Sequence, residues 1–229
     1  MLYSVVEHLL VGPPLRLLFR PDVEGLDHIP ACGPAILAGN HPSFSDSAFL
    51  GVVARRKVVF LAKAEYFAGP GVKGFLVRQL MSGAGNIPVE RGHGRAALAS
   101  LDVAKRVLAA GQLFGIYPEG TRPPDGRLYR GKTGVARLAL ETGAPLIPVA
   151  MLNTYEIQPP GTVVPKIRQV RVRIGAPLDL VPYRGRPDRR AAERELTDEL
   201  MRRLQGLSGQ EYVPIYAQQA KDRAASAEG

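Results

Sequence analysis

The chain has 229 residues, of which 45% are hydrophobic and 22% charged, a balance typical of a folded domain with a packed core and unlike that of a disordered segment. The 30 lysines and arginines against 21 aspartates and glutamates give a formal net charge of +9, which favours phosphate-bearing ligands, nucleic acid or an anionic membrane surface as partners. Aromatic residues make up only 7%, and zinc-knuckle and basic-zipper patterns are absent, so we expect no nucleic-acid partner.

The first 20 residues are apolar but are interrupted by a glutamate, a histidine, an arginine and the pair Pro13-Pro14. This segment is too broken to span a bilayer, which takes roughly 20 apolar residues, and it lacks the features of a cleaved signal peptide. Its apolar residues recur at helical spacing, at Leu2, Val5, Val6, Leu9 and Leu10. Two interpretations stay open: a helical segment at a membrane surface, or a terminal helix packed on the core.

Five short apolar runs follow, at residues 35–38, 58–61, 113–117, 146–150 and 170–174. The first four show little alternation, which is expected of strands buried on both faces. The last alternates valine and isoleucine with arginine and should lie near a sheet edge.

Helical spacing separates these runs, at about 46–54, 72–82, 94–110 and 132–142, with a charged helix expected at 187–206. Alternating strands and helices predict an α/β fold, a single domain with a mostly parallel central sheet flanked by helices, plus an amino-terminal amphipathic helical segment.

In such a fold, ligands bind at the carboxyl ends of the strands. The first strand is followed directly by Gly39-Asn40-His41-Pro42-Ser43-Phe44-Ser45-Asp46. A chain that turns at Pro42 can bring the Asp46 carboxylate to one imidazole nitrogen of His41, which leaves the other nitrogen to accept a proton. The alternative is that Asp46 only caps the helix that begins near Ser47.

Cations follow three further apolar runs, at Lys63, Arg91 and Arg122. Arg122 ends the segment Tyr117-Pro118-Glu119-Gly120-Thr121-Arg122, in which the glycine allows close approach of the backbone to a ligand. Three cations at three strand ends favour a shared anion site, although each alone can equally be a solvated surface charge. Arg130 and Lys132 are additional candidates for anion contacts.

Four segments in this order, 40–46, 85–91, 119–122 and 146–149, resemble the ordered blocks of the glycerolipid acyltransferase family, which includes lysophosphatidate acyltransferases. The resemblance covers roughly residues 20–180 and implies that His41 is a general base oriented by Asp46. It also implies an acceptor phosphate site, made of Lys63, Arg91, Glu119, Gly120, Thr121 and Arg122. Tyr117 stands where the family often has phenylalanine.

The resemblance further implies transfer of a fatty acyl group from acyl-CoA or acyl carrier protein to lysophosphatidate in phospholipid synthesis, without a covalent intermediate. Glycerol 3-phosphate and other (glyco)lipid acceptors remain alternatives. Backbone amides near Gly120 are candidate donors to the oxyanion. We expect peripheral attachment at the cytoplasmic face of a membrane, no cofactor and no metal, since the histidines and the single cysteine lack metal-ligand spacing. The oligomeric state stays open. The expected division is a membrane-surface helical segment (1–20), an acyltransferase domain (21–216) and a frayed polar tail (217–229).

Two rival interpretations remain. Residues 126–133, Gly-Arg-Leu-Tyr-Arg-Gly-Lys-Thr, satisfy the phosphate-binding pattern of P-loop nucleotidases. That loop should directly follow a buried strand, and here Pro123-Pro124-Asp125 intervene, so the pattern is expected to be coincidental. A non-enzymatic lipid-binding module is the second rival, and it leaves the pairing of His41 with Asp46 unexplained.

Overall fold

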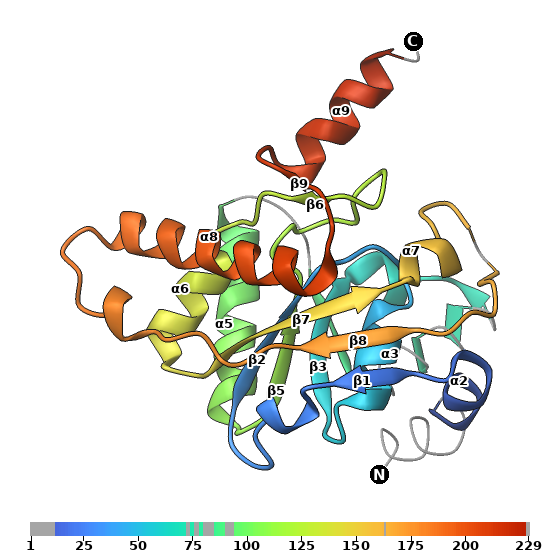
Figure 1. The fold of residues 1–229 in the computed structure, drawn as a ribbon, viewed down its shortest axis with the longest axis horizontal. Coiled ribbons are helices and arrows are strands. Elements are labelled where there is room, and N and C mark those ends of the chain that lie inside the picture. The colour runs from blue at the N-terminus through green and yellow to red at the C-terminus, as the bar shows by residue number, and fades with distance from the viewer. Residues whose placement is uncertain are drawn as a thin grey trace.

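The computed structural model describes residues 12–71, 74–75, 78–79, 85–89, 94–162 and 164–227. Within them, one central sheet contains β1 (Asp22–Glu24), β2 (Ala35–Gly39), β3 (Val58–Lys63), β4 (Asn86–Val89), β5 (Leu113–Ile116), β7 (Leu146–Leu152) and β8 (Arg171–Ile174). The strand order is β1-β8-β7-β2-β5-β3-β4 (Figure 1). A small second sheet pairs β6 (Leu128–Tyr129) with β9 (Tyr212–Val213).

Strands β7, β2, β5, β3 and β4 are mutually parallel, so the mostly parallel sheet that the sequence predicts is confirmed. β8 is antiparallel to β7, and β1 pairs with β8 at the edge. β8 therefore lies next to the edge, as its alternating sequence indicates. Its Val172 and Ile174 are buried, whereas Arg171, the first residue of the strand, is exposed.

Helices cover both faces of this sheet (Figure 1). They are α2 (Gly12–Phe19), α3 (Asp46–Val53), α5 (Arg95–Ala109), α6 (Gly134–Thr142), the short α7 (Thr154–Ile157), α8 (Arg189–Ser208) and α9 (Ala217–Ala227). Short 3₁₀ helices occur at η2 (Leu26–His28), η3 (Ala64–Phe67) and η4 (Val181–Tyr183). Alternate residues of β2 point to opposite layers, because Ile36 and Ala38 pack with α5, α6 and α8 while Ala35 and Leu37 pack with α2 and α3. This double burial explains why β2 lacks polar residues.

The amino-terminal helix α2 packs on the core. Phe19 is buried edge-on against Phe49 with ring centroids 5.1 Å apart, and Arg16 donates to the carbonyl of Val52 at 2.8 Å. Leu17 and Leu18 remain exposed, at 74% and 46%. Residues 1–11, which carry most of the predicted amphipathic stripe, lie outside the described residues. Among the helices that are described, none combines the length and the apolar character needed to cross a bilayer.

The sequence analysis did not predict β1, β6, β9 or α9. The strands are only two or three residues long, and too short to show a hydrophobic period. The expected frayed tail is instead the helix α9, whose sequence is rich in alanine and whose first residue, Ala217, is fully buried. The helix expected at 72–82 lies largely outside the described residues.

Candidate active site

His41 and Asp46 lie together beyond the carboxyl end of β2. The Nδ1 atom of His41 is 2.9 Å from the Oδ2 atom of Asp46, a hydrogen bond in which the imidazole N–H donates. The backbone N–H of Ser43 donates to the same oxygen at 2.8 Å, which closes the turn at Pro42. Asp46 is fully buried, whereas the His41 side chain is 14% exposed. The carboxylate thus does more than begin helix α3, and Nε2 is the imidazole nitrogen left for chemistry.

Tyr117, at the end of β5, holds the imidazole from its flat face. The two rings are stacked, with centroids 3.8 Å apart and planes 8° from parallel. The Tyr117 hydroxyl shares a hydrogen bond of 2.8 Å with Ser47 on α3. Burial and the nearby Asp46 raise the pKa of Tyr117 well above its usual value, so the phenol stays neutral. His41 is therefore fixed by a hydrogen bond at its edge and a ring on its face.

The resemblance assigns Glu119 to the acceptor phosphate site, and the structure shows which groups its side chain contacts. Its carboxylate is buried and accepts backbone N–H bonds from His41 at 3.3 Å and from Tyr129 at 2.9 Å. Burial raises the pKa of Glu119 to about 7, and the two amide bonds oppose that rise. Glu119 thus joins the turn that carries His41 to β6, and its assignment to the phosphate site stays a prediction.

Asn40 fastens the same turn on its other side, a role that the sequence analysis missed. Its Oδ1 accepts from the Met151 amide at 2.7 Å, and its Nδ2 donates to the Met151 carbonyl at 3.0 Å. Nδ2 also donates to Oε1 of Gln210 at 2.7 Å, and Gln210 donates in turn to the carbonyl of Gly126. Gln210 lies 170 residues further along the chain, so no local pattern could have identified it.

The predicted cations gather only in part. Lys63 ends β3, and the guanidinium of Arg122 lies 5.8 Å from the centre of the Phe44 ring, in the turn between His41 and Asp46. Burial lowers the pKa of Lys221 on α9 most, and Arg122 and Lys63 lower it further, so each of these two cations lies within electrostatic range of Lys221. Arg91 lies outside the described residues. Lys221 was not predicted, because its position depends on how α9 folds back.

The backbone amide of Gly120 is already hydrogen-bonded within its own loop. Gly120 has φ +73°, and its N–H donates to the carbonyl of Tyr117 at 3.0 Å. The Gly120 amide hydrogen is thus already used within the turn, and the prediction that other backbone amides near Gly120 stabilise an oxyanion stays a prediction. A Cβ at Gly120 would come within 3.1 Å of the Lys132 side chain, so Lys132 reaches this loop. Arg130 instead lies against the ring of Tyr216, 5.6 Å from its centre.

The hydrogen bonds of residues 126–133 contradict the P-loop interpretation of this segment. A P-loop aims successive amides at phosphates. Here the amides of Leu128 and Arg130 donate to the carbonyls of Glu211 and Ile215, and the amide of Lys132 donates to the carbonyl of Pro118. The segment contains strand β6 where a P-loop would need an open turn.

An apolar cavity of about 200 Å³ adjoins His41. It lies between β3, β5 and the loop that follows β5, and its lining includes Phe60, Leu61, Ile116 and Tyr117. In the described part of the chain, no three histidine, cysteine, aspartate or glutamate side chains cluster as a metal site would require. The site thus combines the hydrogen-bonded pair of His41 and Asp46, a cationic rim formed by Lys63 and Arg122, and an apolar cavity.

A mostly parallel α/β sheet with a histidine–aspartate pair and cations at its carboxyl edge defines a class of proteins suited to proton transfer beside an anionic group. The family model described as Acyltransferase matches residues 20–152, more than half of the 229 residues. The chain belongs to this acyltransferase family.

Several curated relatives carry the name 1-acyl-sn-glycerol-3-phosphate acyltransferase. A chloroplastic one from Brassica napus is 30% identical over 63% of this chain and 40% of its own length. One from Limnanthes alba is 32% identical over 73% and 57%, and one from Borreliella burgdorferi 33% over 58% and 51%. The chain thus matches about two fifths to three fifths of these relatives' lengths.

A solved structure has the same fold. The 1-acyl-sn-glycerophosphate (LPA) acyltransferase PlsC of Thermotoga maritima superposes with a TM-score of 0.64 and 27% identity, covering 90% of this chain and 79% of that one. The likeness extends well beyond residues 20–152, which are those matched by the family model.

Proposed function

We propose that this protein transfers a fatty acyl group from a thioester, acyl-CoA or acyl carrier protein, to the free hydroxyl of lysophosphatidate, giving phosphatidate. The observation that carries this proposal is the hydrogen bond between His41 and Asp46 at a strand end rimmed by Lys63 and Arg122. The names of the relatives and of the structural neighbour support the choice of acceptor.

In the proposed reaction, Nε2 of His41 takes the proton of the acceptor hydroxyl as its oxygen attacks the thioester carbonyl. Asp46 keeps the proton on Nδ1 and stabilises the imidazolium that forms. This attack forms the new C–O bond and gives a tetrahedral intermediate, and collapse of that intermediate re-forms the carbonyl and breaks the C–S bond. His41 then returns its proton to the departing thiolate sulfur, so the enzyme ends in its starting state.

The positions of the two serines between His41 and Asp46 support direct acyl transfer without an acyl-enzyme intermediate. The hydroxyls of Ser43 and Ser45 are hydrogen-bonded to each other at 2.9 Å, and Ser43 is fully buried. A serine nucleophile must give its proton to the base, and this pair is instead engaged internally. We therefore propose that acyl transfer proceeds in a ternary complex of enzyme, donor and acceptor.

The apolar cavity next to His41 suits the first carbons of the acyl chain, since its lining is aromatic and aliphatic. The cationic rim suits the acceptor phosphate, and its arginine can bind two phosphate oxygens at fixed geometry. The acceptor hydroxyl then lies between these two regions, beside Nε2. Much of the rate comes from this alignment of three groups.

The acceptor is a membrane lipid, so the protein must work at a bilayer surface. We propose peripheral attachment through α2, because it exposes Leu17 and Leu18 beside Arg16 and Arg20. A cytoplasmic face would fit the thioester donors.

The experiment that tests the activity is a panel of acyl-CoA and acyl carrier protein donors against lysophosphatidate, glycerol 3-phosphate and monoacylglycerol. The products should be identified by mass spectrometry with their acyl positions assigned. We expect phosphatidate from lysophosphatidate as the fastest product. Faster acylation of glycerol 3-phosphate, or of an unphosphorylated acceptor, would overturn the assignment.

A further inference from the structure

Helix α9 reaches the candidate active site from a part of the chain outside residues 20–152, which the family model matches. The Nζ atom of Lys221 on α9 donates to Oγ1 of Thr121 at 2.8 Å, a contact between residues 100 positions apart. Thr121 lies directly between Gly120 and Arg122 in the loop after β5. A carboxy-terminal lysine therefore joins the loop that carries the predicted phosphate site.

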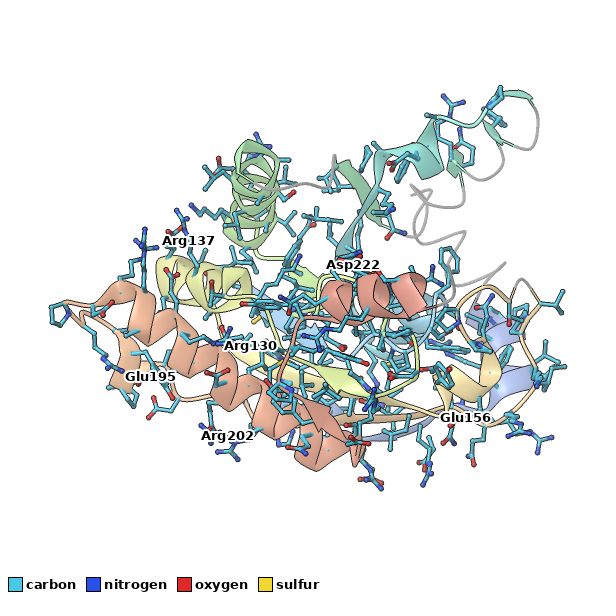
Figure 2. All side chains as sticks on the ribbon, turned by 90° about the horizontal axis from the view of Figure 1, so that it is seen from above. Arg130, Arg137, Glu156, Glu195, Arg202 and Asp222 are labelled. Carbon is cyan, nitrogen blue, oxygen red and sulfur yellow. The ribbon has the colours of Figure 1, made fainter. Side chains whose placement is uncertain are left out.

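The position of α9 is fixed by several contacts that precede Lys221 in the chain. β9 pairs with β6, and the amide of Arg130 donates to the carbonyl of Ile215 at 3.0 Å. The Arg130 guanidinium lies against Tyr216, and Ala217 is fully buried. Figure 1 shows α9 above the upper end of the sheet, and Figure 2 shows it, with Asp222 labelled, crossing over the body of the molecule. Lys221 is thus presented by an anchored helix.

The charge around Lys221 points to an anionic ligand. Burial, Arg122 and Lys63, in that order of effect, lower the pKa of the Lys221 amine. Among the described residues, no carboxylate forms an ion pair with any of these three cations. Like charges repel, and a flexible lysine side chain could avoid this by turning to solvent. Lys221 turns inward, and an ammonium group has three donors, of which Thr121 accepts one.

We propose that Lys221 binds the phosphate of the acceptor together with Lys63 and Arg122, so that helix α9 completes the acceptor site. The inference rests on the proposed function for the identity of the acceptor, and on the contact with Thr121 and the neighbouring cations for the phosphate site. In this arrangement Thr121 positions the ammonium group, and the phosphate takes the two donors that Thr121 leaves. Arg223, two residues further on the same helix, is exposed and provides a matched control.

The first test needs no catalysis. The full-length protein is treated with a limiting amount of an amine-acetylating reagent, and modification of Lys221 is quantified by mass spectrometry against the exposed Lys166. A lysine of lowered pKa carries more neutral amine and should react faster. Glycerol 3-phosphate and inorganic phosphate should each lower the rate of acetylation of Lys221 by about fivefold or more relative to Lys166. The reason is that a charge-assisted bond to phosphate keeps the amine protonated and covered. Glycerol should not protect it. Equal labelling with and without phosphate would overturn the proposal.

The second test compares Lys221→Met with Arg223→Met, since methionine keeps an unbranched side chain and removes the charge. Lys221→Met should raise KM for lysophosphatidate roughly tenfold or more, with little change for monoacylglycerol, because a charge-assisted bond to phosphate is lost. Arg223→Met should change neither. Unchanged KM for both acceptors in Lys221→Met would overturn the inference while leaving the proposed activity intact.

The two tests separate the two proposals. Protection of Lys221 by phosphate in a protein that fails to acylate lysophosphatidate would refute the proposed function and keep the phosphate site. If Lys221→Met does not fold, the acetylation experiment on the parent protein still tests whether Lys221 binds phosphate.

Discussion

The ring of Tyr117 is stacked on the imidazole of His41, 3.8 Å from centre to centre, while its hydroxyl bonds to Ser47 at 2.8 Å. Ser47 lies on α3 next to Asp46, so one helix supplies the carboxylate that bonds the imidazole and the hydroxyl that holds the stacked phenol. The ring plane of His41 is fixed by one contact and its rotation by the other, and this points Nε2 away from both.

Replacing Tyr117 separates these two contributions. Tyr117→Phe keeps the stacked ring, loses only the bond to Ser47 and should retain turnover within about threefold, the size of one neutral hydrogen bond or less. Tyr117→Leu removes the stacking and should lower kcat by roughly threefold to tenfold, which lies within the ~0.5–1.5 kcal/mol of an aromatic pair. Steady-state kcat and KM for both variants are the measurement. Equal activity of the leucine variant and the parent would show that stacking does not position His41.

The histidine–aspartate pair makes the sharpest prediction. His41→Ala should lower turnover roughly 10²–10⁴-fold, the contribution of a positioned base, with its circular dichroism unchanged. Asp46→Asn should also lower kcat strongly with little effect on KM for the acceptor, because an amide favours the wrong imidazole tautomer. Pre-steady-state and steady-state rates on folded variants check this. A folded His41→Ala protein of near-parental activity would eliminate the proposed base.

Arg122 should select for the phosphorylated acceptor. Arg122→Ala is expected to raise KM for lysophosphatidate about tenfold or more while leaving monoacylglycerol little changed, and Arg122→Lys should restore only part of the loss, since a guanidinium binds two oxygens at once. Arg202→Ala, on the exposed surface of α8, is the charge-matched control. Should the alanine variant discriminate between the two acceptors as well as the parent does, Arg122 is not part of the phosphate site.

Glu119 should make stability depend on pH with a defined sign. Its pKa is about 7 in the folded protein against 4.5 for the free group, so the unfolded chain loses this proton first as pH rises. The contribution is fully present below pH 4.5, declines as pH rises through about 7 and amounts to about 3 kcal/mol. Urea unfolding of the parent and Glu119→Gln across this window measures the difference. A difference in unfolding free energy that stays constant from pH 4 to 8 would contradict the prediction.

The membrane contact can be tested without disturbing the core. Leu17→Glu should reduce flotation with anionic vesicles several-fold, because it places a negative charge where the helix would meet lipid headgroups. Val181→Glu is the control, since Val181 is 72% exposed, much like Leu17 at 74%, and lies in η4 before α8. Unchanged flotation of the Leu17 variant would place the contact elsewhere. A deletion of residues 1–20 is less informative, because it removes the buried Phe19.

The sequence predicted what depends on local periodicity and on position relative to a strand. Buried runs such as 35–38 and 146–150 could be recognised because strands covered on both faces lack polar residues. His41 and Asp46 could be paired because a short turn after a strand restricts where the second residue can lie.

Contacts between distant residues could not be predicted in this way. Glu119 accepts from a backbone amide in β6, and Gln210 bonds to Asn40, and neither interaction has a local pattern. The polarity of residues 217–229 suggested a frayed tail, because polar side chains at a chain end gain little from packing on a hydrophobic core. Their alanine content and the burial of Ala217 favour a helix instead.

The bond between Gln210 and Asn40 and the pairing of β9 with β6 impose an order on biosynthesis. Synthesis proceeds from the amino terminus, so β2, β5 and β7 leave the ribosome before Gln210 and β9 do. In that interval the nascent chain already contains His41 and Asp46, but the far side of their turn lacks its final support. Maturation of the site therefore waits until Gln210 and β9 have been synthesised, and a chain truncated before residue 210 would contain the strands of the central sheet with an unfinished site.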